Sequence, residues 1–156
     1  MKKLLLIVVL TLSLFGSSQI KIGSSIDKFN NYSFKTQHGK NIKIPKNVKT
    51  IIISYEKDTG RLVNKYLNAK YPPYLAKMNA VFIADIHEMP SIITKLFAMP
   101  KMRKYKHTIY IYNEDDFSEF VKPQDEKITV IKFSDKQVSK IYHISNAKEL
   151  KKAFEN

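Results

Sequence analysis

The sequence predicts an α/β domain with three layers (α/β/α), in which helices cover both faces of a mixed β-sheet and a β-hairpin precedes the sheet. Three observations carry this prediction. Short β-branched runs alternate with amphipathic helical patterns, which indicates parallel strands joined by right-handed crossovers. Some of these runs contain almost no polar residue, as expected of strands buried on both faces. The last two strand patterns flank a short turn, so the closing pair is antiparallel and the sheet is mixed.

The first elements are a hairpin and a buried strand. Residues 32–36 and 41–44 form short strands around a turn at 37–40, in which Gly39 can adopt a positive φ. The run TIIISY at 50–55 is almost continuously β-branched or aromatic. It therefore predicts a strand with both faces buried.

A helix and a second buried strand follow. Asp58-Thr59-Gly60 offers a helix N-cap at Asp58. The predicted helix has one apolar stripe, formed by Leu62, Val63, Tyr66 and Leu67. Pro72-Pro73 interrupts the chain before a short helical turn at 74–78, and the run AVFIADI at 80–86 predicts the next buried strand.

The middle of the chain repeats this alternation. Met89-Pro90-Ser91 opens a second long helix, which we expect to end near Pro100 because proline disfavours helical backbone in the residue before it. Residues 108–112 (TIYIY) predict a third buried strand, and 115–121 a short helix. The second long helix carries its large apolar residues on one face: Ile92, Ile93, Leu96 and Phe97.

The chain closes with a hairpin and a helix. Residues 128–133 and 138–144 form the two strands of this hairpin. Asn146 and Glu149 have the spacing of a capping box, which predicts the start of a terminal helix. The residues of that helix expected to face the core are Ala147, Leu150 and Phe154.

The first residues of the chain predict export. Lys2 and Lys3 precede an uncharged, mainly apolar run at 4–15, which is too short to span a bilayer comfortably. Small residues follow at the spacing that signal peptidase recognises, so we expect a signal peptide at 1–18, cleavage after Ser18, and a single periplasmic domain at 19–156. The alternative is an uncleaved N-terminal anchor.

The chain is strongly basic, with a formal net charge of +13 over 156 residues. We do not expect nucleic acid as a partner, because nearly all of this charge is lysine spread along the chain and the arginines are only Arg61 and Arg103. Export would also remove the chain from intracellular nucleic acid. A solvated basic surface is the simplest interpretation, and weak contact with an anionic membrane surface stays open.

The order of the elements resembles the thioredoxin superfamily, and more closely its extracytoplasmic thiol-reductase and peroxiredoxin branch. The resemblance covers essentially all of residues 20–156. In redox-active members a Cys-x-x-Cys motif begins the first crossover helix, at a position that falls here near residues 60–63 (Gly-Arg-Leu-Val). Those members also place a cis-proline before the closing hairpin, which falls near Lys127, and Pro123 is too far upstream to match.

The chain contains no cysteine, so it lacks the thiolate on which this family's chemistry depends. Thiol–disulfide exchange and thiol-dependent peroxide reduction are therefore excluded, and no cofactor is expected. The signal peptide, the Asp58-Thr59-Gly60-Arg61 helix start and the ending at 128–150 are more similar to the cysteine-less, YtfJ-type periplasmic branch. That resemblance implies the fold and the compartment, and little mechanism.

One candidate ligand-binding site lies at the ancestral active-site position. Exposed N–H groups at Asp58, Thr59 and Gly60, with Arg61 beside them, could bind an anion, although an ordinary helix cap explains the same residues. Asp85, His87 and Glu88 lie at the end of the second buried strand and just beyond it, where ligands of α/β folds usually bind. Their spacing lacks a recognisable metal motif, so we predict no metal site and retain His87 as a ligand-binding candidate.

A second candidate is a partner-binding surface formed by Lys101, Arg103, Lys104 and Lys106, with His107 at its end. It could contact an acidic partner or anionic lipid, and a solvated connection is the simpler explanation. Three function hypotheses remain. The first is an exported, non-catalytic protein that binds a partner or small ligand. The second is an enzyme of another class, which would require Thr59, Arg61 and His87 to converge in one pocket. The third is association with a membrane surface, which predicts salt-sensitive binding to anionic vesicles that is lost when Lys101, Arg103 and Lys104 are neutralised.

Overall fold

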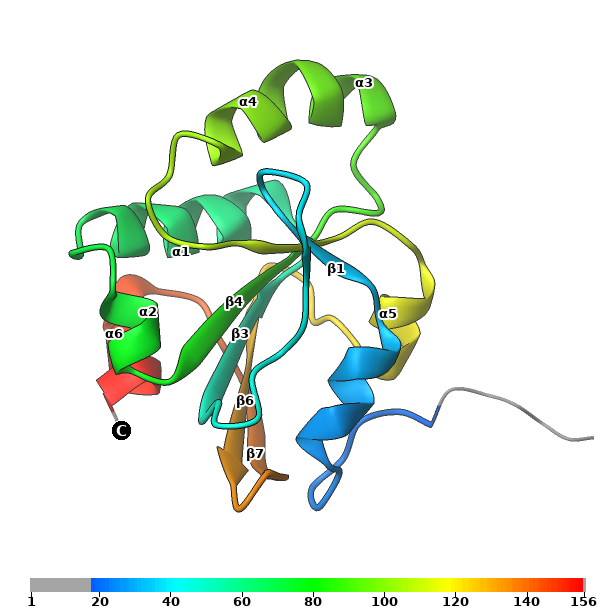
Figure 1. The fold of residues 1–156 in the computed structure, drawn as a ribbon, viewed down its shortest axis with the longest axis vertical. Helices are drawn as coiled ribbons and strands as arrows, with labels where there is room; N and C mark the ends of the chain where they lie inside the picture. The colour runs from blue at the N-terminus through cyan, green and yellow to red at the C-terminus, as the bar shows by residue number, and fades with distance from the viewer. Residues whose placement is uncertain (1–17, 156) are drawn as a thin grey trace, which may run out of the picture.

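The computed structural model describes residues 18–155, and the fold is built on one seven-stranded mixed sheet with the order β2-β1-β5-β4-β3-β6-β7 (Figure 1). The predicted signal peptide at 1–18 lies outside the described residues apart from Ser18. Within the described part of the chain, no helix is long and apolar enough to cross a membrane.

The N-terminal part supplies one edge of the sheet. A 3-10 helix, η1 (Ile26–Asn31), precedes the hairpin strands β1 (Phe34–Thr36) and β2 (Asn41–Ile42). These two strands pair antiparallel, and β1 also pairs antiparallel with β5 (Tyr110–Tyr112). The hairpin is therefore joined to the sheet through β5.

The centre of the sheet is formed by β3 (Thr50–Ser54) and β4 (Ala80–Asp85), which pair in parallel. Every residue of both strands is buried. The helices α1 (Lys57–Asn68) and α2 (Tyr74–Lys77) make the crossover between them. β4 then pairs in parallel with β5, so the three predicted buried strands are adjacent, as expected.

The connection from β4 to β5 contains one continuous helical segment, which we call the arm. It consists of α3 (Ser91–Ile93), the π-helical turn η2 (Thr94–Ala98) and α4 (Met99–Met102). The segment ends at Met102, close to the predicted end near Pro100, and Pro100 lies inside it. The wide turn explains this: Met99 N–H donates to Thr94 O, five residues back, which relieves the crowding that a proline causes in an α-helix.

The C-terminal part completes the other edge. After α5 (Asp116–Phe120), β6 (Ile128–Ser134) and β7 (Gln137–Ile144) form the predicted hairpin, and β6 pairs antiparallel with β3. The terminal helix α6 is Ala147–Glu155. Its predicted cap is confirmed, since Glu149 N–H donates to Asn146 Oδ1 at 2.9 Å.

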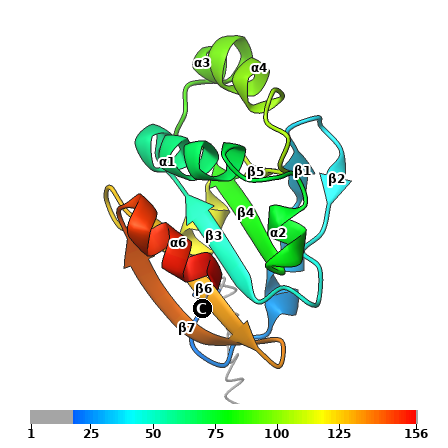
Figure 2. The ribbon, with the colours of Figure 1, turned by 90° about the vertical axis from the view of Figure 1, so that its left-hand side faces the viewer.

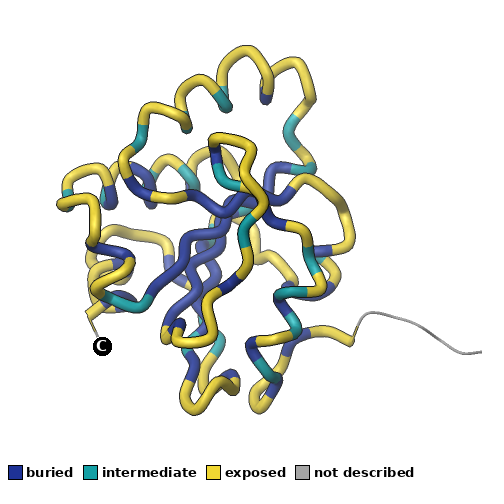
Figure 3. Tube along the Cα trace, in the orientation of Figure 1, coloured by how far each residue is buried: buried dark blue, intermediate teal, exposed yellow. Residues whose placement is uncertain are grey.

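The two faces of the sheet have separate cores. Helices α1, α2 and α6 cover one face (Figure 2), where Val63, Leu67 and Leu150 pack on Ile52 and Phe82. On the other face, η1 and α5 pack on a second core that is rich in aromatic rings. The arrangement is therefore the predicted three-layer α/β/α architecture, and the buried residues follow the strands through its middle (Figure 3). The second core includes Phe29, Phe34, Phe117, Phe120, Ile51, Ile53 and Phe133.

The segment η1 is the part of this core that the sequence pattern did not predict. Phe29 is fully buried, and its ring contacts the rings of Phe117, Phe120 and Phe133 at centroid distances of 6.2, 5.2 and 6.0 Å. The short 3-10 helix thus fills the space between the sheet and α5. Hydrophobic periodicity does not reveal it, because a helical period is recognised over windows of about 11–18 residues and this helix has six.

Replacing Phe29 by alanine should therefore destabilise the domain by about 3–5 kcal/mol, because it removes a ring from a fully packed site and leaves a cavity. Urea unfolding monitored by circular dichroism measures the change. Ile22→Ala is the matched control, since Ile22 is a large apolar residue that is exposed, and its loss should cost little. Equal effects of the two substitutions would contradict the placement of η1 in the core.

Candidate functional site

A cavity of about 350 Å³ lies at the edge of the sheet where β3 and β4 end, between the start of α1 and the arm. We call it the edge cavity. Loops beyond the carboxyl ends of parallel strands form the usual ligand site of α/β folds, because adjacent strands open there toward diverging connections. The topology therefore places this cavity where the fold most readily builds a site.

The first turn of α1 forms one wall of the edge cavity. Gly60 lies so close to the end of β3 that a Cβ atom at this position would stand 3.3 Å from Ser54 Oγ. Asn64, one turn further, donates from its amide nitrogen to Gly60 O at 2.9 Å and also lines the cavity. Glycine at position 60 therefore permits the close approach of helix and strand that shapes this wall.

The N-cap of α1 is Glu56, so the prediction that Asp58 caps the helix is wrong. Glu56 N–H donates to Thr59 Oγ1 at 3.3 Å, and the Thr59 hydroxyl donates to Glu56 O at 3.0 Å. The Glu56 carboxylate accepts from Glu126 N–H at 2.9 Å, where Glu126 has φ 57°. This bond ties α1 to the loop before β6. Among the described residues, that loop contains no cis peptide bond near Lys127.

Asp85 is the buried polar group at the floor of the edge cavity. Its Oδ1 accepts from His87 N–H at 3.1 Å and lies 2.7 Å from His87 Nδ1. Its Oδ2 is buried and has no hydrogen-bond partner among the described residues. Burial raises the pKa of Asp85, and the two bonds from His87 lower it in part. The carboxyl group can therefore accept a hydrogen bond from a ligand, or donate one when protonated.

Tyr55 closes the cavity beside Asp85. Its hydroxyl donates to Val121 O at 2.5 Å, which joins the end of β3 to the segment after α5. Burial raises the pKa of this phenol strongly, and the nearby Asp85 carboxylate raises it further. Tyr55 therefore stays neutral and serves as a fixed wall.

The arm forms the roof with Ile93, Phe97 and Met102, and Met89 before the arm and Tyr105 after it also line the cavity. Flexible methionines and aromatic rings give a lining that can adapt to an apolar ligand. None of these residues was predicted from the sequence as part of a site. The only signal was the apolar stripe of the second long helix, which includes Ile93 and Phe97.

The predicted residues are only partly brought together. Gly60 and Arg61 line the edge cavity, whereas Thr59 is buried in the helix cap. Asp58 is exposed and pairs with Arg61 at 3.1 Å. His87 is joined to the site through Asp85. Thr59, Arg61 and His87 therefore do not converge in the way that the enzyme hypothesis requires.

The predicted basic surface is also divided by the structure. Lys104 and Lys106 are exposed, and Lys101 lines the rim of the edge cavity. Arg103 donates through Nε to Gln37 O at 3.3 Å, which anchors the end of the arm to the hairpin turn. His107 is buried and does not belong to this surface.

His107 instead ties the strand β5 region to α1. Its Nε2 lies 2.8 Å from Asn64 Oδ1, and its ring stacks on Tyr105 with centroids 5.2 Å apart. The Gln37 side chain accepts from Ile109 N–H and donates to His107 O, so the backbone here is fully fixed. Burial lowers the pKa of His107 to about 4. The imidazole is therefore neutral at physiological pH.

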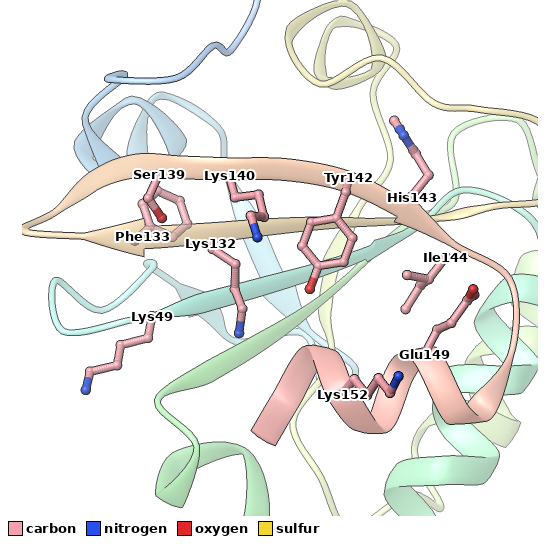
Figure 4. Close-up of a pocket in the computed structure, with 10 residues that line it drawn as sticks. All are labelled: Lys49, Lys132, Phe133, Ser139, Lys140, Tyr142, His143, Ile144, Glu149 and Lys152. Carbon is pink, nitrogen blue, oxygen red and sulfur yellow. The ribbon is translucent and has the colours of Figure 1, made fainter. Parts of the chain in front are cut away.

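A second, more open concavity lies between β7 and α6 (Figure 4). Lysines dominate it, and Lys132 and Lys140 face each other directly across β6 and β7. Lys132 Nζ donates to Thr50 Oγ1 at 2.9 Å and to Ala153 O at 2.6 Å. These bonds give Lys132 a structural role in holding the end of α6 to the sheet, because a cation is favourable at a helix C-terminus.

No group of three or more His, Cys, Asp or Glu side chains within residues 18–155 is arranged to hold a metal ion. Asp85 and His87 are bonded to each other, and Glu88 Oε1 is 3.9 Å from His87 Nε2. The last residue of β4, Asp85, thus forms an acid–imidazole pair with His87.

Comparison with solved structures shows a thioredoxin-like fold. A protein described as a thioredoxin from Neisseria meningitidis is similar over 88% of this chain and 93% of its own, with 13% identity and a TM-score of 0.54. StoA from Bacillus subtilis is similar over 80% of this chain and 96% of its own, with 14% identity and a TM-score of 0.50. No protein-family model and no curated protein matches the sequence. The likeness establishes the fold alone.

The buried His107 predicts a specific pH dependence of stability. Because its folded-state pKa of about 4 lies below the ordinary 6.5, the unfolded chain binds a proton between these values that the folded chain does not. Stability should therefore fall as the pH decreases from 6.5 to 4, by up to about 3 kcal/mol from this group.

His107→Gln keeps a donor near Asn64 and removes this titration, so its unfolding free energy should vary less over that pH range. Urea unfolding at a series of pH values measures the difference from the parent chain. His38→Gln, at an exposed histidine, is the control and should reproduce the parent slope. An unchanged slope in His107→Gln would contradict the assignment.

Proposed function

We propose that this chain is an exported, non-catalytic protein that binds a small amphiphilic ligand in the edge cavity, without thiol redox activity. The observation that carries the proposal is a roofed, largely apolar cavity at the site edge of a thioredoxin-like fold in a chain without cysteine. Such a cavity is the default binding site of a domain when a few polar groups converge on it.

The lining favours a ligand with an apolar body. Met89, Ile93 and Phe97 on one side face Tyr55 and Ile86 on the other wall of the cavity. The volume of about 350 Å³ falls within the range of small-molecule sites. Burying an apolar group here would release water from both surfaces, which is the main favourable contribution to binding.

The rim favours an anionic end on that ligand. Lys57, Arg61 and Lys101 contribute cationic side chains, and Arg61 is an arginine suited to a carboxylate or phosphate. Inside, Asp85 Oδ2 offers an acceptor to a ligand hydroxyl or amide. An amphiphile with one anionic end and a hydrogen-bond donor along its body would match the apolar lining, the cationic rim and the acceptor of Asp85.

Export to the periplasm is part of this proposal. Its support is the charged, apolar and small-residue pattern of residues 1–18, which has the three parts of a signal peptide.

An enzyme that reuses this edge is the second candidate, and the Asp85–His87 pair favours it. A carboxyl group with a raised pKa that is bonded to an imidazole is a common acid–base arrangement. An enzyme of this kind would need Thr59, Arg61 and His87 to converge in one pocket, and they do not. Binding is therefore the better-supported function.

Filling the cavity should test the proposal directly. Ala98 lines the edge cavity and Leu96, two residues earlier on the arm, does not. Ala98→Trp should therefore weaken binding of N-phenyl-1-naphthylamine, an apolar fluorescent probe, by tenfold or more, and Leu96→Trp should leave it unchanged. Equal binding by both variants would show that the probe does not occupy the edge cavity.

The rim can be tested with a pair of probes. Arg61→Gln should weaken binding of the anionic probe 1-anilinonaphthalene-8-sulfonate several-fold and leave binding of the neutral probe unchanged, because only the anionic probe gains from the guanidinium. Lys148→Gln, at an exposed lysine on α6, is the control. A parallel loss of both probes would argue against a cationic rim that selects the ligand.

A further inference from the structure

The arm exposes an unusual amount of apolar surface. Ile92, Ile93, Leu96 and Phe97 have exposed fractions of 63, 42, 61 and 65%. Helices α1 and α6, in contrast, bury their apolar stripes against the sheet. A continuous group of large exposed apolar residues on a folded chain indicates a surface that another structure covers.

The edge cavity explains only half of this group. Ile93 and Phe97 line the cavity, so a bound ligand would cover part of them. Ile92 and Leu96 do not line it, and both side chains are mostly exposed. These two residues need a different partner.

The position of the arm makes it accessible to a flat surface. It lies beyond the end of the sheet, separate from the helices that cover the two faces, and it forms the upper limit of the molecule in both views (Figures 1 and 2). Its outer surface is mostly exposed (Figure 3). A convex helix at the end of a domain can lie along a plane without a clash from neighbouring elements.

The charge around the arm selects an anionic partner. Residues 89–106 contain no aspartate or glutamate, and their basic residues are Lys95, Lys101, Arg103, Lys104 and Lys106. A basic amphipathic helix with leucine, isoleucine and phenylalanine on its apolar face is typical of segments that lie in the interface of an anionic bilayer. Each lysine or arginine near such a surface adds an attraction that salt screens.

We propose that residues 89–106 form a docking surface for an anionic phospholipid bilayer. The arm lies in the plane of the interface with Ile92, Leu96 and Phe97 in the headgroup region, and the lysines contact lipid phosphates. This surface shares Phe97 and Lys101 with the edge cavity, so docking would place the mouth of that cavity against the bilayer.

The test uses residues 19–156, so that the apolar N-terminal run cannot itself bind lipid. Both cores of the described structure lie within residues 20–154, so this part of the chain keeps every core contact. The chain has no tryptophan, and Leu96→Trp therefore introduces a single reporter on the arm. Its emission should shift to the blue on addition of phosphatidylglycerol vesicles and stay unchanged with phosphatidylcholine vesicles. Ile22→Trp, at an exposed position far from the arm, should show no shift.

Cosedimentation with the same vesicles measures affinity. Two double variants should each weaken binding by about tenfold or more: Ile92→Ser/Leu96→Ser and Lys95→Gln/Lys104→Gln. The first removes apolar burial in the headgroup region, and the second removes electrostatic attraction to the lipid phosphates. Ile22→Ser and Lys46→Gln/Lys148→Gln are matched controls at exposed positions elsewhere. Binding of the parent chain should also decrease as sodium chloride is raised.

Two results would overturn the proposal. One is the absence of vesicle binding at low salt, or equal losses in the arm variants and their controls. The other is a dimer of the parent chain, measured by light scattering, that Leu96→Ser dissociates in the absence of any lipid binding. That result would identify a second copy of the chain as the partner of the arm.

Discussion

The rest of the structure depends on the complete burial of β3 between a parallel neighbour, β4, and an antiparallel neighbour, β6. Side chains alternate along a strand, so Ile51 and Ile53 enter one core and Ile52 enters the other. This strand therefore contributes to both cores, as β4 does with Ile83 and Phe82, and the shared sheet aligns the two helical layers. Because β3 and β4 are parallel, their ends coincide, and the site edge follows from the same pairing.

The sequence predicted the fold well wherever a local pattern and the tertiary environment agreed. Continuous β-branched runs became β3 and β4, and the turn before β7 adopts positive φ at Asp135 and Lys136, as a two-residue hairpin turn requires. The arm was interpreted differently from what the structure shows. Its apolar stripe has helical periodicity, but periodicity does not state what the stripe contacts, and here no layer of the sheet is left for it to cover.

The candidate site was predictable only in its position. Strand and helix order placed Gly60 and Arg61 at the edge of the sheet, since both belong to the first turn of the crossover helix. The roof could not be predicted, because Ile93 and Phe97 reach the cavity through the path of the arm. His107 shows the same limit: it follows a basic run, but the stack on Tyr105 and the bond to Asn64 draw it inward. The thioredoxin-like architecture thus keeps its site edge while different side chains occupy it.

The wide turn η2 makes the arm one residue longer than an α-helix of the same number of turns would be. Deleting a single residue from this turn would restore ordinary α-helical spacing and rotate the preceding residues by about 100° relative to the following ones. Ile92 and Leu96 would then change the side they present, while Met102 would keep its place against the core. The width of this one turn therefore sets which side chains the arm presents outward.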